Sequence, residues 1–150
     1  MLSQAVGYAA TALGYVAAAS GKPVLVKEIA DACHIPGPYL AKIVHALSKA
    51  GFVSTQRGIG GGVVLARAAA EISLYHLCAA LGDPAVDERC MLGVAPCSEE
   101  RACPCHRFWS PQRLRQMEFL RGMTVADIAA FETRRRWARP TPTEVRGAHG

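Results

Sequence analysis

The residues best suited to chemistry in this 150-residue sequence are gathered in one short stretch. Thiolates are soft ligands that bind zinc and iron–sulfur clusters, and a histidine can replace one thiolate of a cluster. Crowded thiols can also serve as redox groups. We therefore treat residues 83–107, the cysteine loop, as a candidate metal or redox site. A stretch of seventeen residues in this loop contains five residues of metal-ligand type: Cys90, Cys97, Cys103, Cys105 and His106.

The spacing of the loop cysteines favours iron–sulfur over zinc. Zinc ribbons usually show two close Cys-x-x-Cys pairs, whereas six and then five residues separate Cys90, Cys97 and Cys103. Two alternatives stay open: a zinc-stabilised interaction module, and unpaired thiols on a flexible connection. Cys33 and Cys78 instead fall on expected helices among apolar neighbours, which is typical of small core residues.

Two helices joined by a tight turn are expected upstream, over 27–33 and 38–50. Pro36 and Gly37 force the turn, and Pro38 stands in the first turn of the second helix. The second helix has a buried stripe at helical spacing: Leu40, Ile43, Val44 and Leu47. Its other face carries basic side chains: Lys42, His45 and Lys49. This is the helix-turn-helix pattern of DNA-binding proteins.

A glycine-rich hairpin is expected directly after these helices. Residues 52–56 alternate apolar and polar side chains, residues 63–65 resume the strand, and Arg57 opens the loop between them. Four glycines in five positions could also suggest a phosphate-binding loop, but no Lys-Ser or Lys-Thr pair follows and the loop leads into a strand. We interpret this segment as a wing.

The remaining elements frame these two motifs. An Ala-rich helix is expected within 1–20, a short strand over 24–26, and a helix over 73–81 with Ser73 as its cap. A helix over 110–121 should bury Leu114, Met117 and Leu120, and a last helix after Thr124 should turn four residues inward: Val125, Ile128, Ala129 and Phe131. The first cationic side chain is Lys22, so the N-terminal segment does not look like a leader. We expect a soluble, cytoplasmic chain with no membrane segment.

Charge is distributed unevenly along the chain, whose formal net charge is +5. Residues 1–70 carry a surplus of positive charge, residues 71–106 are net acidic, and residues 107–150 are basic again. The basic surplus suits a polyanionic partner. We find no paired carboxylates, no nucleophile with a base and no cofactor fingerprint in context, so an enzyme is not expected.

Several motifs together resemble the Rrf2 family of bacterial winged-helix transcription regulators over about residues 1–131. The family includes an iron–sulfur cluster regulator and a nitric-oxide-sensing repressor. The resemblance rests on these residues and on the downstream cysteines: Tyr8, Glu28-Ile29-Ala30, Ile35, Tyr39-Leu40, Gly51-Phe52-Val53 and Arg57-Gly58-x-Gly60-Gly61-Gly62.

The resemblance implies a homodimer joined by the helix after the cysteine loop, and a cluster held by Cys90, Cys97 and Cys103. His106 and Trp109 match a histidine and a tryptophan that follow the third cysteine in the cluster regulator, so His106 is the implied fourth ligand, with Cys105 as the alternative. The nitric-oxide sensor instead uses a carboxylate from the first helix of its partner, and this sequence has no Asp or Glu before Glu28. A 2Fe–2S cluster is expected rather than a 4Fe–4S cluster.

These patterns predict a mainly α-helical fold with a small β wing. We expect a winged helix-turn-helix domain (1–82), the cysteine loop (83–107), dimerisation and C-terminal helices (108–133) and a basic, disordered tail (134–150). The predicted function is a repressor of bacterial transcription that binds a pseudo-palindromic operator in double-stranded DNA, with an affinity that responds to an iron–sulfur cluster or to thiol redox state. The rival function is an iron–sulfur electron carrier. The residues expected to contact DNA are Lys22, Lys27, Tyr39, Lys42, His45, Lys49, Arg57, Gly58 and Gly60.

Overall fold

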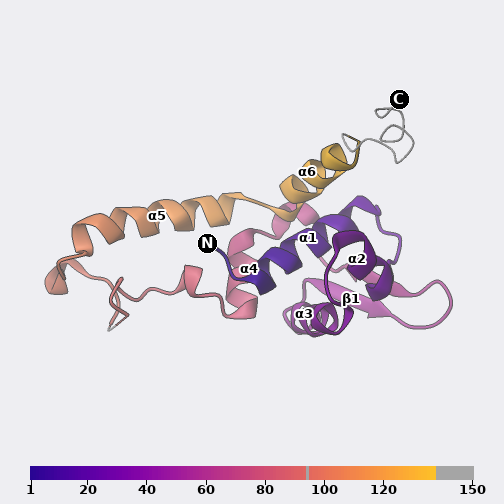
Figure 1. Ribbon diagram of the computed structural model, residues 1–150, viewed down its shortest axis with the longest axis horizontal. Coiled ribbons are helices and arrows are strands. Elements are labelled where there is room, and N and C mark those ends of the chain that lie inside the picture. Colours follow the sequence, from indigo (N-terminus) through magenta and orange to yellow (C-terminus); the bar gives the residue numbers. More distant parts are fainter. Residues whose placement is uncertain (94, 138–150) are drawn as a thin grey trace, which may run out of the picture.

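The core of the protein is built around helix α1 (Gln4–Ala18), as the computed structural model of residues 1–93 and 95–137 shows (Figure 1). Its side chains are small and apolar on most sides, and the helix contacts α2, α3, α4, α6 and β2. At Gly14 an added Cβ would come within 3.0 Å of Ile128, so a larger residue would push α6 away. Seven residues of α1 are buried: Val6, Ala9, Ala10, Ala12, Leu13, Gly14 and Val16.

Helices α2 (Val26–Cys33) and α3 (Gly37–Lys49) form the expected helix-turn-helix. The C-cap residue that follows α2 is His34, which adopts a left-handed conformation with φ 55°. The predicted apolar stripe of α3 is confirmed, because all four of its residues are buried. The strand expected over 24–26 is wrong: Val24 forms only an isolated bridge with Val63, and Val26 already belongs to α2.

The wing consists of strands β1 (Val53–Gln56) and β2 (Gly62–Leu65), which pair antiparallel with Val53 opposite Leu65. Gly62 has φ +147°, and an added Cβ there would lie 2.6 Å from the backbone of Val24. Glycine therefore lets the hairpin approach the segment before α2 closely enough to form the bridge with Val24. This hairpin confirms the expected wing.

Helix α4 (Leu74–Leu81) packs against α1 and α3 and leads into the cysteine loop. The 3-10 helix η1 (Ala69–Glu71) precedes it. Ser73 caps α4 as expected, since its side chain accepts a hydrogen bond from the His76 N–H. Gly82, with φ +65°, ends the helix. The loop that follows contains two further short 3-10 helices, η2 (Pro84–Val86) and η3 (Glu99–Arg101).

Helix α5 (His106–Gly122) projects away from the winged part of the molecule, and the cysteine loop runs out to its far end (Figure 1). It begins four residues before the expected start and contains Pro111 within it. Met117 and Leu120 are buried as predicted, but Leu114 is 62% exposed, so the prediction was wrong there. The physical reason is that α5 reaches the body only in its C-terminal half.

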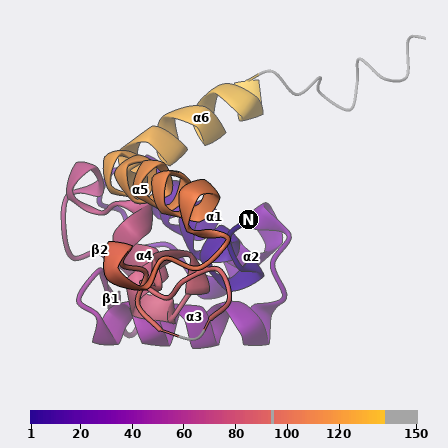
Figure 2. The ribbon, with the colours of Figure 1, turned by 90° about the vertical axis from the view of Figure 1, so that its left-hand side faces the viewer.

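Helix α6 (Val125–Trp137) returns to the body and lies against α1, above α5 as Figure 2 shows. Val125 is buried and Ile128 lies over α1, but Phe131 is 51% exposed, contrary to expectation. The helix includes residues 134–137, which the sequence assigned to a disordered tail. Residues 138–150 of that tail lie outside the described residues. No helix in the described part of the chain is long and apolar enough to cross a bilayer.

Candidate nucleic-acid interface and cysteine loop

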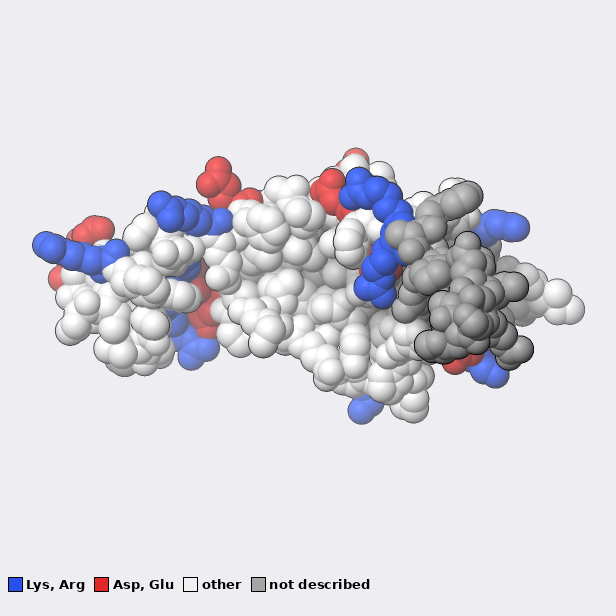
Figure 3. All heavy atoms as spheres, turned by 45° about the horizontal axis from the view of Figure 1, so that its top comes forward, with Lys and Arg blue, Asp and Glu red and all other residues white. Residues whose placement is uncertain are grey.

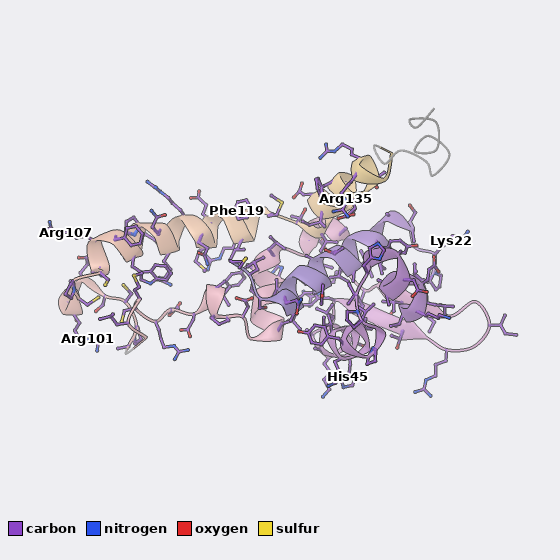
Figure 4. The ribbon with its side chains drawn as sticks, viewed as in Figure 1. Lys22, His45, Arg101, Arg107, Phe119 and Arg135 are labelled. Carbon is purple, nitrogen blue, oxygen red and sulfur yellow. The ribbon has the colours of Figure 1, made fainter. Side chains whose placement is uncertain are left out.

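The outer face of the helix-turn-helix and wing is exposed. Figure 4 places Lys22 and His45 in the winged part of the molecule, at the opposite end from Arg101 and Arg107. All nine residues that the sequence assigned to DNA contact are exposed: Lys22, Lys27, Tyr39, Lys42, His45, Lys49, Arg57, Gly58 and Gly60.

Tyr39, at the start of α3, is held by an aromatic neighbour. Its ring packs edge-on against Tyr8 of α1, with centroids 5.6 Å apart and an interplanar angle of 78°. The Tyr8 hydroxyl in turn accepts a hydrogen bond from Gln4 Nε2 at 3.0 Å. The sequence identified both tyrosines but not their contact, which joins α1 directly to α3, the second helix of the helix-turn-helix.

A groove of about 400 Å³ separates the start of α2 from the wing. Lys27 and Gly58 both line it, together with Gln56 and Gly62. The start of α2 and the wing thus border one hollow on this face. Away from this face the charges are mixed, and the middle of the surface drawn in Figure 3 is largely uncharged.

The first half of the cysteine loop is a small hairpin. The Cys97 N–H donates to the Glu88 carbonyl at 3.0 Å, and the Cys90 N–H donates to the Ala95 carbonyl at 2.8 Å. Cys90 and Cys97 therefore stand on opposite arms. Cys90 also lines a hollow of about 450 Å³ with Trp109, whose indole N–H donates to the Arg89 carbonyl at 3.4 Å.

Cys97 and His106 are brought together at the start of α5. The Cys97 Sγ lies 3.3 Å from His106 Nδ1, and His106 Nε2 lies 3.0 Å from Glu99 Oε1. His106 is only 7% exposed, and its backbone N–H donates to the Cys103 carbonyl at 2.9 Å. Cys105 is the N-cap residue of α5. Sequence reasoning missed Glu99, for which no motif gives a signal.

The candidate ligands are not fully assembled. Within residues 1–93 and 95–137, no three His, Cys, Asp or Glu side chains are gathered closely enough to hold a metal ion. The four loop cysteines are all partly buried. The structure pairs Cys97 Sγ with His106 Nδ1, and within the described residues this pair is not part of a group of three. The donor types still suit a cluster, because thiolates and imidazole are its usual ligands.

The cysteines outside the loop have a different character. Cys78 is fully buried in the core. Burial, together with the nearby charge of Asp83, raises the pKa of this thiol to about 11. A thiol with so little thiolate is an inert core residue, as the sequence predicted. Cys33, at the end of α2, is only partly buried.

Asp83 anchors the cysteine loop to the central helix. Its carboxylate accepts a hydrogen bond from the Ser3 N–H at 2.8 Å and another from the Ala85 N–H at 2.7 Å. Burial opposes ionisation of this group, which is 5% exposed, but the hydrogen bonds outweigh burial and lower its pKa. Ser3 also caps α1, so a single carboxylate fixes the start of α1 to the start of the loop.

Comparison with known proteins identifies the family. Residues 2–130 match Rrf2, described as an iron-dependent transcriptional regulator. The chain belongs to the Rrf2 family. It is therefore a member of a family of transcriptional regulators rather than of enzymes.

Individual Rrf2 relatives agree with this assignment. The HTH-type transcriptional regulator IscR of Sodalis glossinidius is 33% identical over 126 residues, which cover 83% of this chain and 76% of that protein. The structure of CymR, the global cysteine regulator of B. subtilis, has a TM-score of 0.72 and 26% identity, covering 87% of this chain and 97% of that one. The T. potens IscR structure, at 22% identity and TM-score 0.68, covers 97% and 96% of the two chains and shows the same fold.

The Asp83 anchor gives a pH-dependent prediction. In Asp83→Asn an amide NH₂ replaces one acceptor oxygen, and we expect the free energy of unfolding at pH 7 to fall by about 1.5–3 kcal/mol, the range for a hydrogen bond to a charged group. Because the folded-state pKa is lowered, the stabilisation is present above the unfolded value of 3.8 and is lost as pH falls through the folded value. Urea denaturation of both proteins between pH 7 and pH 3 should therefore show the difference shrinking.

The matched control is Asp31→Asn, at an exposed position on α2. It should change the unfolding free energy by less than about 0.5 kcal/mol, as surface substitutions usually do. If Asp83→Asn behaved like this control at every pH, the anchor would be contradicted.

Proposed function

We propose that this Rrf2-family chain represses transcription by binding a pseudo-palindromic operator in double-stranded DNA as a homodimer. The observation that carries the proposal is the outer face of α3, where Lys42, His45 and Lys49 are exposed opposite a buried apolar stripe. A helix of this kind fits the major groove, and cationic side chains along it neutralise phosphates.

Each element of the exposed face has a role in this proposal. Tyr39 and Lys42 lie near bases or phosphates at the start of α3, while His45 and Lys49 follow along the groove. Arg57 reaches the adjacent minor groove from the wing, with Gly58 and Gly60 allowing close approach of the backbone. Lys22 and Lys27 bind phosphates beside the groove between α2 and the wing.

Helix α5 supplies the proposed dimer contact. Phe108 and Phe119 are 61% and 56% exposed. They are eleven residues apart, which is about three helical turns, so they share one face. Met117, buried against the body, lies on the opposite face of the helix. A second copy of α5 would cover these aromatic rings and place the two α3 helices about a two-fold axis, which requires two related half-sites.

The cysteine loop is the proposed sensor. Cys90, Cys97, Cys103 and His106 would hold an iron–sulfur cluster, with Cys105 as the alternative fourth ligand and 2Fe–2S as the expected type. The contact between Cys97 Sγ and His106 Nδ1 supports His106. A bound cluster would supply a redox-sensitive link between the hairpin arms and the start of α5. Operator affinity would respond to the presence or redox state of that link.

A second sensing chemistry is supported by one observation. The CymR structure, to which this chain is similar with a TM-score of 0.72 and 26% identity, is that of a global cysteine regulator. Cys97, with an imidazole beside it, would then respond to oxidants as a thiol without any metal. The electron-carrier and zinc-module alternatives find no support in a family of transcriptional regulators.

The wing gives a direct test of DNA binding. Arg57→Ala should weaken operator binding about ten- to hundredfold and reduce the slope of log K against log salt by about 0.9 if it also loses a phosphate contact. Fluorescence anisotropy at several salt concentrations measures both. Arg134→Ala removes the same charge at an exposed position on α6 and should leave both unchanged. Equal losses in the two variants would show that only net charge matters.

The dimer contact can be tested independently of DNA. Phe119→Glu would place a carboxylate in the proposed interface, so sedimentation velocity should show monomer at concentrations where the unchanged chain is dimeric. Phe131→Glu, at an exposed aromatic position on α6, is the matched control and should remain dimeric. A Phe119→Glu protein that sediments as a dimer would contradict the role of α5.

The cofactor is tested by anaerobic reconstitution with iron and sulfide. Cys97→Ala should lose the visible absorption and the bound iron, while its circular dichroism stays helical because the loop lies outside the core. Cys33→Ala should keep the colour. His106→Ala should give a weaker or altered cluster and Cys105→Ala a near-normal one; the reverse order would make Cys105 the fourth ligand. An unchanged chain that stays colourless would favour thiol sensing instead.

A further inference from the structure

His106 is held between a thiol and a carboxylate. Its ring is nearly buried at the start of α5, with Nδ1 toward Cys97 Sγ and Nε2 toward Glu99 Oε1. We infer that Glu99 is a positioning residue, which fixes the His106 ring so that Nδ1 is the nitrogen presented to the proposed cluster. This inference rests on the proposed function of the cysteine loop.

The two contacts together determine which nitrogen is available. An ionised carboxylate can only accept hydrogen bonds, so the 3.0 Å contact with Glu99 Oε1 places a hydrogen on Nε2. A histidine must be neutral to bind a metal, so with the hydrogen on Nε2 the lone pair of a ligating His106 is on Nδ1, the atom that lies 3.3 Å from Cys97 Sγ. A histidine that binds a metal commonly donates its other N–H to a carboxylate, which fixes both its tautomer and its orientation.

The distance between the two donor atoms also fits shared ligation. When a sulfur and a nitrogen atom bind one tetrahedral metal ion at typical distances of about 2.3 and 2.0 Å, the two donor atoms are about 3.5 Å apart. The observed 3.3 Å between Cys97 Sγ and His106 Nδ1 is close to that value. A 180° flip of the ring about its Cβ–Cγ bond would put Cδ2 in the place of Nδ1 and Cε1 in the place of Nε2. It would lose the contact with Glu99, so the carboxylate stabilises the ligating orientation.

Glu99 has a close structural control. Glu99 is the first residue of η3, and its side chain is 88% exposed although it contacts His106. Glu100, the next residue in η3, is also exposed and carries the same charge. A general electrostatic effect of the loop would therefore involve both carboxylates, whereas positioning of His106 involves Glu99 alone.

The first measurement uses the full chain without metal. Nitrogen NMR of histidine-labelled protein should show His106 with its hydrogen on Nε2. Glu99→Ala should lose this preference and give a mixture of the two tautomers, Glu99→Gln should retain much of it because its amide oxygen still accepts, and Glu100→Ala should match the unchanged chain. A His106 signal that is identical in all four proteins would overturn the inference.

The second measurement uses chain reconstituted with iron and sulfide. Loss of the carboxylate partner of a metal-bound histidine typically weakens metal binding 10- to 100-fold, so iron release to a chelator should be about that much faster in Glu99→Ala. Glu100→Ala should release iron at the unchanged rate. With histidine labelled at one nitrogen, electron–nuclear spectroscopy of the reduced cluster should show strong coupling to Nδ1. Strong coupling to Nε2 would overturn the inference.

These two measurements separate the inference from the proposed function. If the unchanged chain takes up no cluster, the cofactor proposal fails, and the nitrogen spectra alone decide whether Glu99 orients His106. If the cluster forms but Glu99→Ala and Glu100→Ala release iron equally fast, the cofactor proposal stands and the role of Glu99 is contradicted.

Discussion

Close packing around α1 is the constraint on which the rest of the structure depends. Because its residues are small and apolar on most sides, α2, α3, α4 and α6 can all pack closely against it. At Gly14 the approach of α6 leaves no room for a side chain, since an added Cβ would lie 3.0 Å from Ile128. The N-terminal end of the same helix meets both functional regions. Tyr8 packs on Tyr39 of the proposed reading helix, and Ser3 donates to Asp83 at the start of the cysteine loop.

This arrangement gives a physical route from the loop to the DNA-facing surface. The Ser3–Asp83 contact is a hydrogen bond to a buried charge, worth about 1.5–3 kcal/mol. The coupling free energy between two ligand sites is typically about 1–3 kcal/mol. Loss of the Ser3–Asp83 hydrogen bond would therefore be large enough to account for coupling of that size. The loop also leads into α5, and in the proposed dimer the placement of α5 would set the distance between the two α3 helices. The first route begins at Asp83, before the first candidate ligand, and the second at the start of α5, where the last candidate ligand lies.

The sequence predicted the elements whose determinants are local. The buried stripe of α3, the Ser73 cap and the glycine wing follow from spacing and residue type, and the structure contains them. Leu114 and Phe131 were predicted to be buried and are exposed, because helical periodicity identifies an apolar face but not how far the body extends along it. Val24 pairs only because Gly62 admits its backbone.

The candidate site divides in the same way. Residue types and resemblance located the cysteines and His106, but the contacts of Glu99 and Asp83 depend on the path of an irregular loop with no periodicity to predict it. The exposure of Lys42, His45 and Lys49 follows from the buried apolar stripe on the other face of α3, which can be read along the chain. The contact of the nine residues of the winged face with DNA stays a prediction.

The central claim is that the state of the cysteine loop sets operator affinity. It is tested most directly by measuring the affinity of one full-chain preparation for its operator, anaerobically, before and after the loop is loaded with iron and sulfide. The account predicts a change of about 5- to 150-fold, corresponding to the usual range of coupling free energies. Equal affinities for the two states, with loading verified by bound iron, would contradict it.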